Sequence, residues 1–402
     1  MRRFAWAAYG MYALSGTTAV ILGAIMPEFL RYYHTSYAVG GRVVFTQAMG
    51  FLIGVPLVYH AMTRYHLRHI LSAAALCVSL AQVALFLLPP MALVYLLVIF
   101  NGIGASALET VVATVVLELL VEQRAIYMSR LEVSFGLGAL LLPACASALI
   151  ALGHWRFSFL LISGLSLALA LFWQAIEVPK DPVVASHHRD ADMTPPPVFP
   201  GRLAKIAMLA IFLFMTFIYV GLEGSVNSFM PAIFATGLHT ANDVAVLSSS
   251  VFWIAMVLGR LAIGWAARHL RYDQYLWISV SLALLVLLAF TAVRHQGAGF
   301  ALIFGLGLAM AAIYSVLMVY ANHTFPGMTR TITSLVTALA GAGGAVFPAF
   351  IGYAMDHLAI HGVLWCLAGL AACLWLGLLA IRLGFRCLHA KMPSELEPQA
   401  PF

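Results

Sequence analysis

The sequence predicts an all-α membrane protein with twelve transmembrane helices in two pseudo-symmetric six-helix bundles. Hydrophobic residues make up 63% of the 402 positions and charged residues only 9%, whereas soluble domains average about 25% charged residues. The hydrophobic residues lie in long continuous runs, and a membrane-spanning helix needs about 20 mostly apolar residues. This composition excludes a soluble, disordered or collagen-like chain, and the length of the runs argues against a β-barrel.

Twelve apolar runs define the expected helices. The first run is longer than the apolar core of a cleavable signal peptide, so we expect it to be retained as a transmembrane helix. The expected spans are 6–26, 39–59, 70–88, 91–119, 129–153, 156–176, 203–225, 243–266, 275–293, 298–324, 331–354 and 361–385. They group into an N-terminal bundle (1–176), a polar, proline-rich cytoplasmic linker (177–202), a C-terminal bundle (203–388) and a cytoplasmic tail (389–402).

The lysines and arginines predict the orientation. When alternate connections are assigned to opposite sides, all but four of these 21 residues fall on one side. Cytoplasmic loops carry such an excess, so we expect both termini in the cytoplasm and a multi-pass protein of the cell inner (plasma) membrane. The net charge of +6 is interpreted as this signal, and we expect the lipid bilayer, not nucleic acid, as partner.

The two halves of the chain repeat each other at matching places. A glycine followed by a basic cluster occurs at 54–71 (GVPLVYHAMTRYHLRHIL) and at 259–276 (GRLAIGWAARHLRYDQYL). A glycine run followed by proline occurs at 135–143 (FGLGALLLP) and at 340–348 (AGAGGAVFP). This recurrence indicates a duplicated six-helix unit. The small residues would let neighbouring helices approach closely.

These segments resemble the major facilitator superfamily of secondary transporters, and the resemblance covers almost the whole chain. GRLAIGWAARHLR is similar to that superfamily's cytoplasmic loop motif, G-R-x-x-x-G-x-x-x-R. Three further segments resemble the fucose-permease group of sugar–proton symporters: GIGASALETVVA (102–113), SFGLGALLLP (134–143) and YVGLEGSVNSFMP (219–231). The resemblance implies the major facilitator fold and alternating access. It also implies proton-coupled movement of a small organic solute such as a sugar.

One position departs from the fucose-permease pattern. In that group a helix-1 aspartate, four residues before a proline, helps to couple protons, and the matching position here is Gly23 in GAIMPEF (23–29). The helix-4 glutamate is retained as Glu109. We therefore do not expect a direct copy of the coupling mechanism of that group.

Two acids fall in the middle of predicted spans. A charged side chain there costs about 2.5–3.5 kcal/mol on insertion scales, so Glu109 and Glu223 need a reason to be present. Because carboxyl groups buried away from water bind protons more readily, we predict proton coupling at both positions. For Glu109 the alternative is a partner for a buried arginine or a hydrogen-bonded structural acid. For Glu223 a substrate role stands beside the proton role, and a structural salt link or a helix cap is the alternative.

The remaining acids and the loop motif predict a cytoplasmic gate. The resemblance implies that the motif residues brace one conformation, whereas plain topology signalling is the alternative. Glu132 either belongs to this loop network or enters the cavity as a third proton-coupling acid. The expected gate residues are Gly259, Arg260, Gly264, Arg268, Glu118 and Glu122.

Polar and aromatic side chains within the spans predict the solute cavity, because a sugar site combines aromatic faces with hydrogen-bonding groups. The candidates are Tyr12, Gln47, Asn101, Thr110, Asn227 and Tyr314. The cysteines lack metal-ligand spacing and no phosphate-binding loop is present, so we expect no metal, cofactor or enzymatic activity, and a monomer. A proton-driven exporter of drugs or amphipathic compounds is the alternative function.

Overall fold

The fold is a bundle of long helices. A computed structural model describes residues 2–119, 124–175, 202–325 and 328–390, and within these ranges it contains fourteen helices and no strand. The linker at 177–201, Glu122 and most of the tail (391–402) lie outside the described residues. The all-α membrane class predicted from composition is therefore confirmed.

The helices follow one another with short connections. Their bounds are α1 Arg2–Ala24, α2 Met26–Tyr33, α3 Tyr37–Met62, α4 Leu67–Phe86, α5 Met91–Leu119, α6 Arg124–Ala151, α7 Phe157–Gln174, α8 Arg202–Gly237, α9 Asn242–His269, α10 Tyr272–Thr291, α11 Gln296–Met310, α12 Ile313–Thr324, α13 Thr329–His357 and α14 Ile360–Ala390. Eleven described helical segments are long and apolar enough to cross a membrane, and α1 with α2, bent by 54°, supplies a twelfth span.

Three elements differ from the predicted spans. The first span breaks at Ile25, because Pro27 opens α2 and its ring cannot continue the preceding helix. The span expected at 298–324 is divided into α11 and α12. The span expected to end at residue 225 continues to Gly237, because the polar residues after it are buried against other helices and do not end the helix.

The packing of the helices repeats between the halves. In the N-terminal bundle α1 packs on α6, α3 on α5 and α4 on α7, and in the C-terminal bundle α8 packs on α13, α9 on α11 and α10 on α14. The contacts between the bundles repeat in the same way. Helix α3 packs on α13, and their counterparts in the opposite halves, α9 and α6, pack on each other. This correspondence supports the predicted duplication of a six-helix unit.

The predicted glycine runs allow these crossings. Gly138 of α6 lies against the carbonyl oxygen of Ala13 in α1, and Gly343 of α13 lies against that of Phe217 in α8. A β-carbon at either glycine would collide with the facing backbone. The two related crossings therefore use glycine in the same way.

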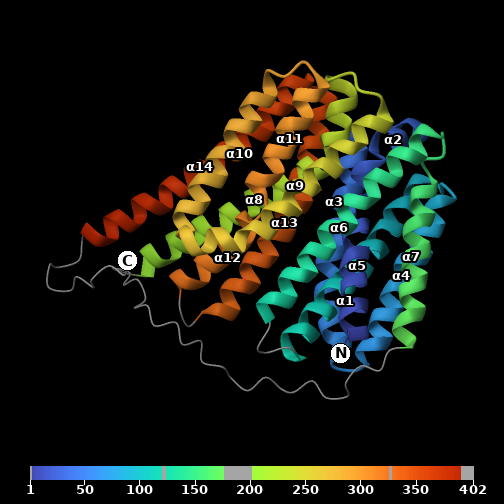
Figure 1. The fold of residues 1–402 in the computed structure, drawn as a ribbon, viewed down its shortest axis with the longest axis horizontal. Helices are drawn as coiled ribbons and strands as arrows, with labels where there is room; N and C mark the ends of the chain where they lie inside the picture. Colours follow the sequence, from blue (N-terminus) through green and yellow to red (C-terminus); the bar gives the residue numbers. More distant parts are fainter. Residues whose placement is uncertain (1, 120–123, 176–201, 326–327, 391–402) are drawn as a thin grey trace.

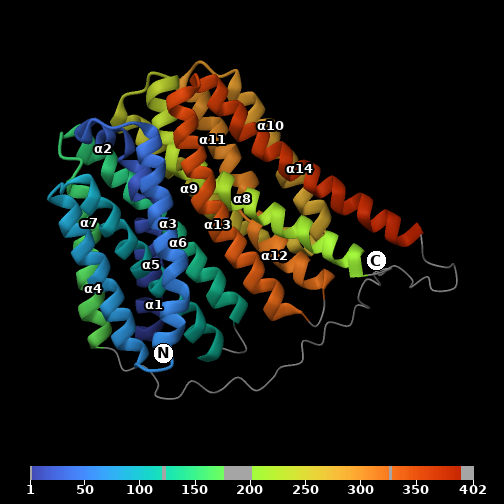
Figure 2. The same ribbon diagram turned by 180° about the vertical axis from the view of Figure 1, so that it is seen from behind.

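The two bundles meet at one end and diverge at the other. Figures 1 and 2 show the helices close together at the α2 and α11 end, and farther apart toward the end where the N-terminus lies. Because both views agree, the interface between the bundles is tightest at the end opposite the N-terminus. The candidate site lies between these two regions.

Candidate transport site

Glu109 is held by the first helix of its own bundle. The Ser15 hydroxyl of α1 donates a hydrogen bond of 2.5 Å to the Oε1 atom of Glu109 in α5, and the Tyr12 hydroxyl lies 3.5 Å from the Glu109 carbonyl oxygen. The Glu109 side chain is half-buried. Ser15, which sequence reasoning missed, thus supplies the helix-1 partner for this acid. Its sequence signal is weak, because Thr17 and Thr18 place further hydroxyl groups in the same stretch of α1.

The departure at Gly23 has a steric explanation. A β-carbon at Gly23 would lie 2.5 Å from the Asn227 carbonyl oxygen and 2.8 Å from the Ser228 Cα atom. Since α1 and α8 belong to different bundles, this glycine permits direct backbone contact across the interface. An aspartate at this position does not fit the conformation seen here.

Arg260 joins the two bundles. Its Nη1 atom donates to the Oε2 atom of Glu132 at 3.1 Å and to the Glu132 carbonyl oxygen at 3.4 Å, so α9 is linked to α6. Its Nε atom donates to the Ala311 carbonyl oxygen at 3.3 Å, in the break between α11 and α12. The Arg260 side chain is 19% exposed and that of Glu132 is 48% exposed. Glu132 therefore faces an accessible space beside the bundle interface.

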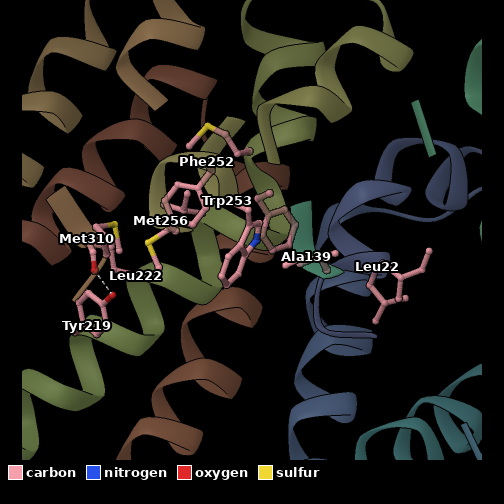
Figure 3. Close-up of a cluster of buried hydrophobic side chains, with 14 of the residues drawn as sticks. Leu22, Ala139, Tyr219, Leu222, Phe252, Trp253, Met256 and Met310 are labelled. Carbon is pink, nitrogen blue, oxygen red and sulfur yellow. Dashed lines mark hydrogen bonds between the residues drawn. The ribbon is translucent and has the colours of Figure 1, made fainter. Parts of the chain in front are cut away.

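A polar chain continues from Arg260 into the interior. The guanidinium carbon lies 5.6 Å from the centre of the Trp253 ring, a cation–π arrangement. The Trp253 Nε1–H donates to the Asn227 Oδ1 atom at 2.9 Å, and the Asn227 amide donates to the Ala19 carbonyl oxygen at 3.3 Å. Figure 3 shows Trp253 in the buried cluster with Phe252. The Trp253 indole and the Asn227 amide thus connect α9, α8 and α1, which belong to both bundles.

Glu223 lies near the same arginine. It is half-buried on α8, and its charge interacts with those of Arg260 and Glu132. One turn earlier, the buried Tyr219 hydroxyl donates to the Met310 carbonyl oxygen at 2.7 Å (Figure 3). The charge of Glu132 also acts on Glu109. Glu132 and Glu223 therefore lie near Arg260, and Glu109 lies near Glu132.

The predicted cavity residues separate into two groups. The Gln47 amide donates to the Thr18 carbonyl oxygen at 2.9 Å, and Tyr314 is half-buried in α12, where the charges of the three acids act on its hydroxyl. Tyr12, Thr110 and Asn227 join these two residues in the first group, whose members lie on α1, α3, α5, α8 and α12. Asn101 forms the second group. Thr110 is half-buried beside Glu109.

Asn101 requires a correction. We expected it to line the cavity, but it is 1% exposed, and its Oδ1 atom accepts a hydrogen bond of 3.0 Å from the Gln82 amide. Because a buried amide needs a polar partner, Asn101 pairs with α4 inside the N-terminal bundle. Sequence spacing alone did not show that α4 offers such a partner.

The predicted gate residues are described only in part. Gly259 packs against the Ala311 side chain, so α9 approaches the break between α11 and α12. The side chains of Glu118 and Arg268, and the surroundings of Gly264, are outside what the structure describes, as is Glu122. Arg260 pairs with Glu132 at the bundle interface.

The opposite end is closed by polar contacts between the bundles. Asp356, in the last turn of α13, accepts hydrogen bonds from the backbone N–H groups of Tyr37 at 2.9 Å and Ala38 at 2.8 Å. These belong to the first turn of α3, whose N–H groups have no partner within the helix. Glu28 of α2 is 5% exposed and accepts a bond of 2.6 Å from the Asn242 amide. Sequence reasoning missed Asp356 and Asn242.

The fold and the site define a multi-pass membrane transporter built from two related bundles. The chain belongs to the major facilitator superfamily, whose sequence profile matches residues 8–348. It is accordingly a secondary transporter and not an enzyme, and the resemblance noted from the sequence is confirmed.

Relatives of established identity cover nearly the whole chain. The glucose/mannose transporter GlcP of Bacillus subtilis is 27% identical over 353 residues, which is 87% of each protein. Among solved structures, a D-xylose–proton symporter aligns with a TM-score of 0.73 and 15% identity, over 96% of this chain and 97% of that one. The nucleoside transporter NupG aligns with a TM-score of 0.72 and 14% identity, over 94% of this chain and 98% of that one. These structural likenesses show the fold.

Proposed function

We propose that this protein carries a monosaccharide-type solute across the inner membrane in symport with protons. The observation that carries the proposal is the placement of Glu132 and Glu223 near Arg260 at the bundle interface, with Glu109 near Glu132. The names of the glucose/mannose relative and of the xylose–proton symporter support the solute class and the coupling ion.

The acids supply sites for protons in this mechanism. Two of these carboxyl groups lie near Arg260 and the third lies near Glu132, so adding a proton to one of them changes the net charge of the cluster. Protonation of Glu132 removes its ionic attraction for Arg260 and weakens a link between α6 and α9. Such a link at an interface between rigid bodies is suited to a conformational switch. Glu109 and Glu223 then load and release protons beside this switch.

Polar groups around the cluster suit a hydroxylated solute. Gln47, Asn227 and Tyr314 offer amide and phenol groups that both donate and accept hydrogen bonds. In the present conformation the first two bond to backbone carbonyl oxygens of α1. A bound sugar would exchange these bonds for its own hydroxyl groups. Solute recognition would thereby be linked to contacts between the bundles.

The orientation follows from the charges and the closed end. With both termini in the cytoplasm, the contacts of Asp356 and Glu28 close the outer side, and the structure is inward-facing. Alternating access then exchanges these contacts for others at the cytoplasmic side. We further propose a monomer as the transporting unit, because each chain contains both bundles.

Uptake into proteoliposomes tests the solute and the coupling. Glucose and mannose are expected to accumulate when the pH is lower outside than inside, and the Glu109→Gln and Glu223→Gln variants are expected to lose this accumulation. Asp273→Asn, which changes an exposed acid of α10, is the matched control. Unchanged accumulation in both glutamine variants would rule out these acids. Uptake or efflux restricted to hydrophobic cations would favour the exporter.

A further inference from the structure

A groove lies on the N-terminal bundle, apart from the transport site. It has a volume of about 400 Å³ and is lined by the end of α3, the start of α4 and the middle of α5. This is within the range of about 300–1,000 Å³ typical of ligand pockets. Tyr65, His69 and Ala73 on its wall are exposed. Because α4 packs on α5 and α7 of its own bundle, the groove opens toward the surroundings of this bundle.

Small residues produce this groove. Gly104 of α5 lies against α4, where a β-carbon would be 3.1 Å from the Ala74 carbonyl oxygen. Ala73, Ala107 and other short side chains leave space above this close contact. The walls are almost entirely carbon, so a polar solute bound there would lose its hydrogen bonds to water without replacement. An acyl chain forms no hydrogen bonds with water, so it loses none when it binds there.

The end of the groove is basic. Arg64 lies in the connection from α3 to α4 and Arg68 in the first turn of α4, and they directly precede the lining residues Tyr65 and His69. Both arginines are exposed, and residues 60–69 (HAMTRYHLRH) contain no acid. Clusters of basic residues at the membrane interface attract anionic lipid headgroups. Charge and apolar surface therefore occur in the order in which they occur along a phospholipid.

The geometry points to a binding site for an anionic glycerophospholipid. Its phosphate lies at the Arg64 and Arg68 end, and one acyl chain lies along Ala73 and Cys77 toward Ala107. The site is distinct from the central cluster, and its occupant is not the transported solute. A bound lipid contacts α3, α4 and α5 together and stabilises this part of the N-terminal bundle, because a ligand stabilises the folded state to which it binds.

Alkylation of cysteines in nanodiscs tests the site directly. Cys77 lines the groove and is half-buried, whereas Cys145 of α6 is exposed away from it and serves as an internal control. We expect phosphatidylglycerol, added to phosphatidylcholine nanodiscs, to slow the N-ethylmaleimide labelling of Cys77 but not of Cys145. Peptide mass spectrometry measures both rates in the same full-length protein. Phosphatidylglycerol is also expected to raise the melting temperature.

Two variants separate the headgroup from the acyl chain. Arg64→Gln with Arg68→Gln should weaken the phosphatidylglycerol effect by about 30-fold in lipid concentration. Ala73→Phe, at an exposed position, should fill the groove and abolish protection. Arg202→Gln with Arg382→Gln, two exposed arginines of the other bundle, removes the same charge and should change nothing.

Each contrary outcome overturns the proposal. Equal protection by phosphatidylcholine would show that anionic charge is not recognised, and protection by soluble glycerophosphate would show that no acyl chain is needed. Loss of the effect in the Arg202 and Arg382 control would show that only net charge matters. Protection retained in Ala73→Phe would place the lipid elsewhere.

Discussion

The Arg260 guanidinium donates to the Glu132 carboxylate at 3.1 Å across the interface between the two bundles. The same side chain also reaches the Ala311 carbonyl oxygen and lies over the Trp253 ring. Arg260 thus contacts α6, α9 and the break between α11 and α12. Any rocking of one bundle against the other at this level changes these contacts, so the pair is a direct measure of conformation.

The first prediction concerns the strength of this pair. Since Glu132 is 48% exposed, its coupling to Arg260 should be weak, about 0.2–1 kcal/mol as for exposed ion pairs. A double-mutant cycle of Glu132→Gln and Arg260→Gln, followed by chemical or thermal unfolding, measures this term. Both variants should also change the transport rate, by up to about fivefold, because a pair of this strength shifts the conformational equilibrium by no more than that factor. A coupling of several kcal/mol, as for buried pairs, would contradict this account.

The second prediction concerns Gly23, where the fucose-permease group has an aspartate. Gly23→Asp should destabilise the protein by at least about 1–3 kcal/mol, the usual cost of overpacking, because its β-carbon meets the Asn227 backbone. Gly164→Ala is the matched control, since nothing lies within 4 Å of a β-carbon there. Melting temperatures in detergent compare the two. If Gly23→Asp melts like the wild type, α1 and α8 are not in the contact described.

The third prediction concerns the closed end. Asp356→Asn replaces a carboxylate that accepts from two N–H groups of α3 with an amide that has one acceptor oxygen. Capping interactions contribute about 1 kcal/mol, so the population open at this end should rise roughly fivefold. Spin labels on the ends of α3 and α13 measure the distribution of distances. Asp243→Asn, in the first turn of α9, is the control, and equal distributions in both variants would refute the role of Asp356.

The fourth prediction separates structure from transport at Asn101. Removing this amide in Asn101→Ala leaves Gln82 buried without its partner, at a cost of about 1–3 kcal/mol. The melting temperature should fall, whereas the KM for the solute should stay the same. A raised KM with unchanged stability would return Asn101 to the cavity.

The sequence predicted the fold well because composition and the positions of lysine and arginine determine the helices that span a bilayer. It also predicted the glycine crossings at Gly138 and Gly343, because close backbone contact requires small residues. The first span was predicted to end at residue 26, close to the break at Ile25, but the short helix α2 that follows was not predicted. Helix α8 was predicted too short, because burial of Asn227 depends on contacts with the other bundle.

The site was predicted only in part. Mid-membrane acids are conspicuous among apolar residues, so Glu109 and Glu223 were found from hydropathy. Ser15 and Asp356 were missed because their partners are more than 90 residues away along the chain. No local pattern encodes such pairing, and the same limit explains why Asn101 was assigned to the cavity.

Solute-driven proton flux tests the central claim most directly. Proteoliposomes with an internal pH dye and no imposed gradient are exposed to glucose or mannose, and the internal pH is followed. The account predicts acidification with the wild type and with Asp273→Asn. It predicts none with Glu109→Gln, even though that variant still exchanges labelled solute across the membrane. Solute entry into wild-type vesicles without any change of internal pH would contradict proton coupling, and undiminished acidification by Glu109→Gln would contradict the role of this acid.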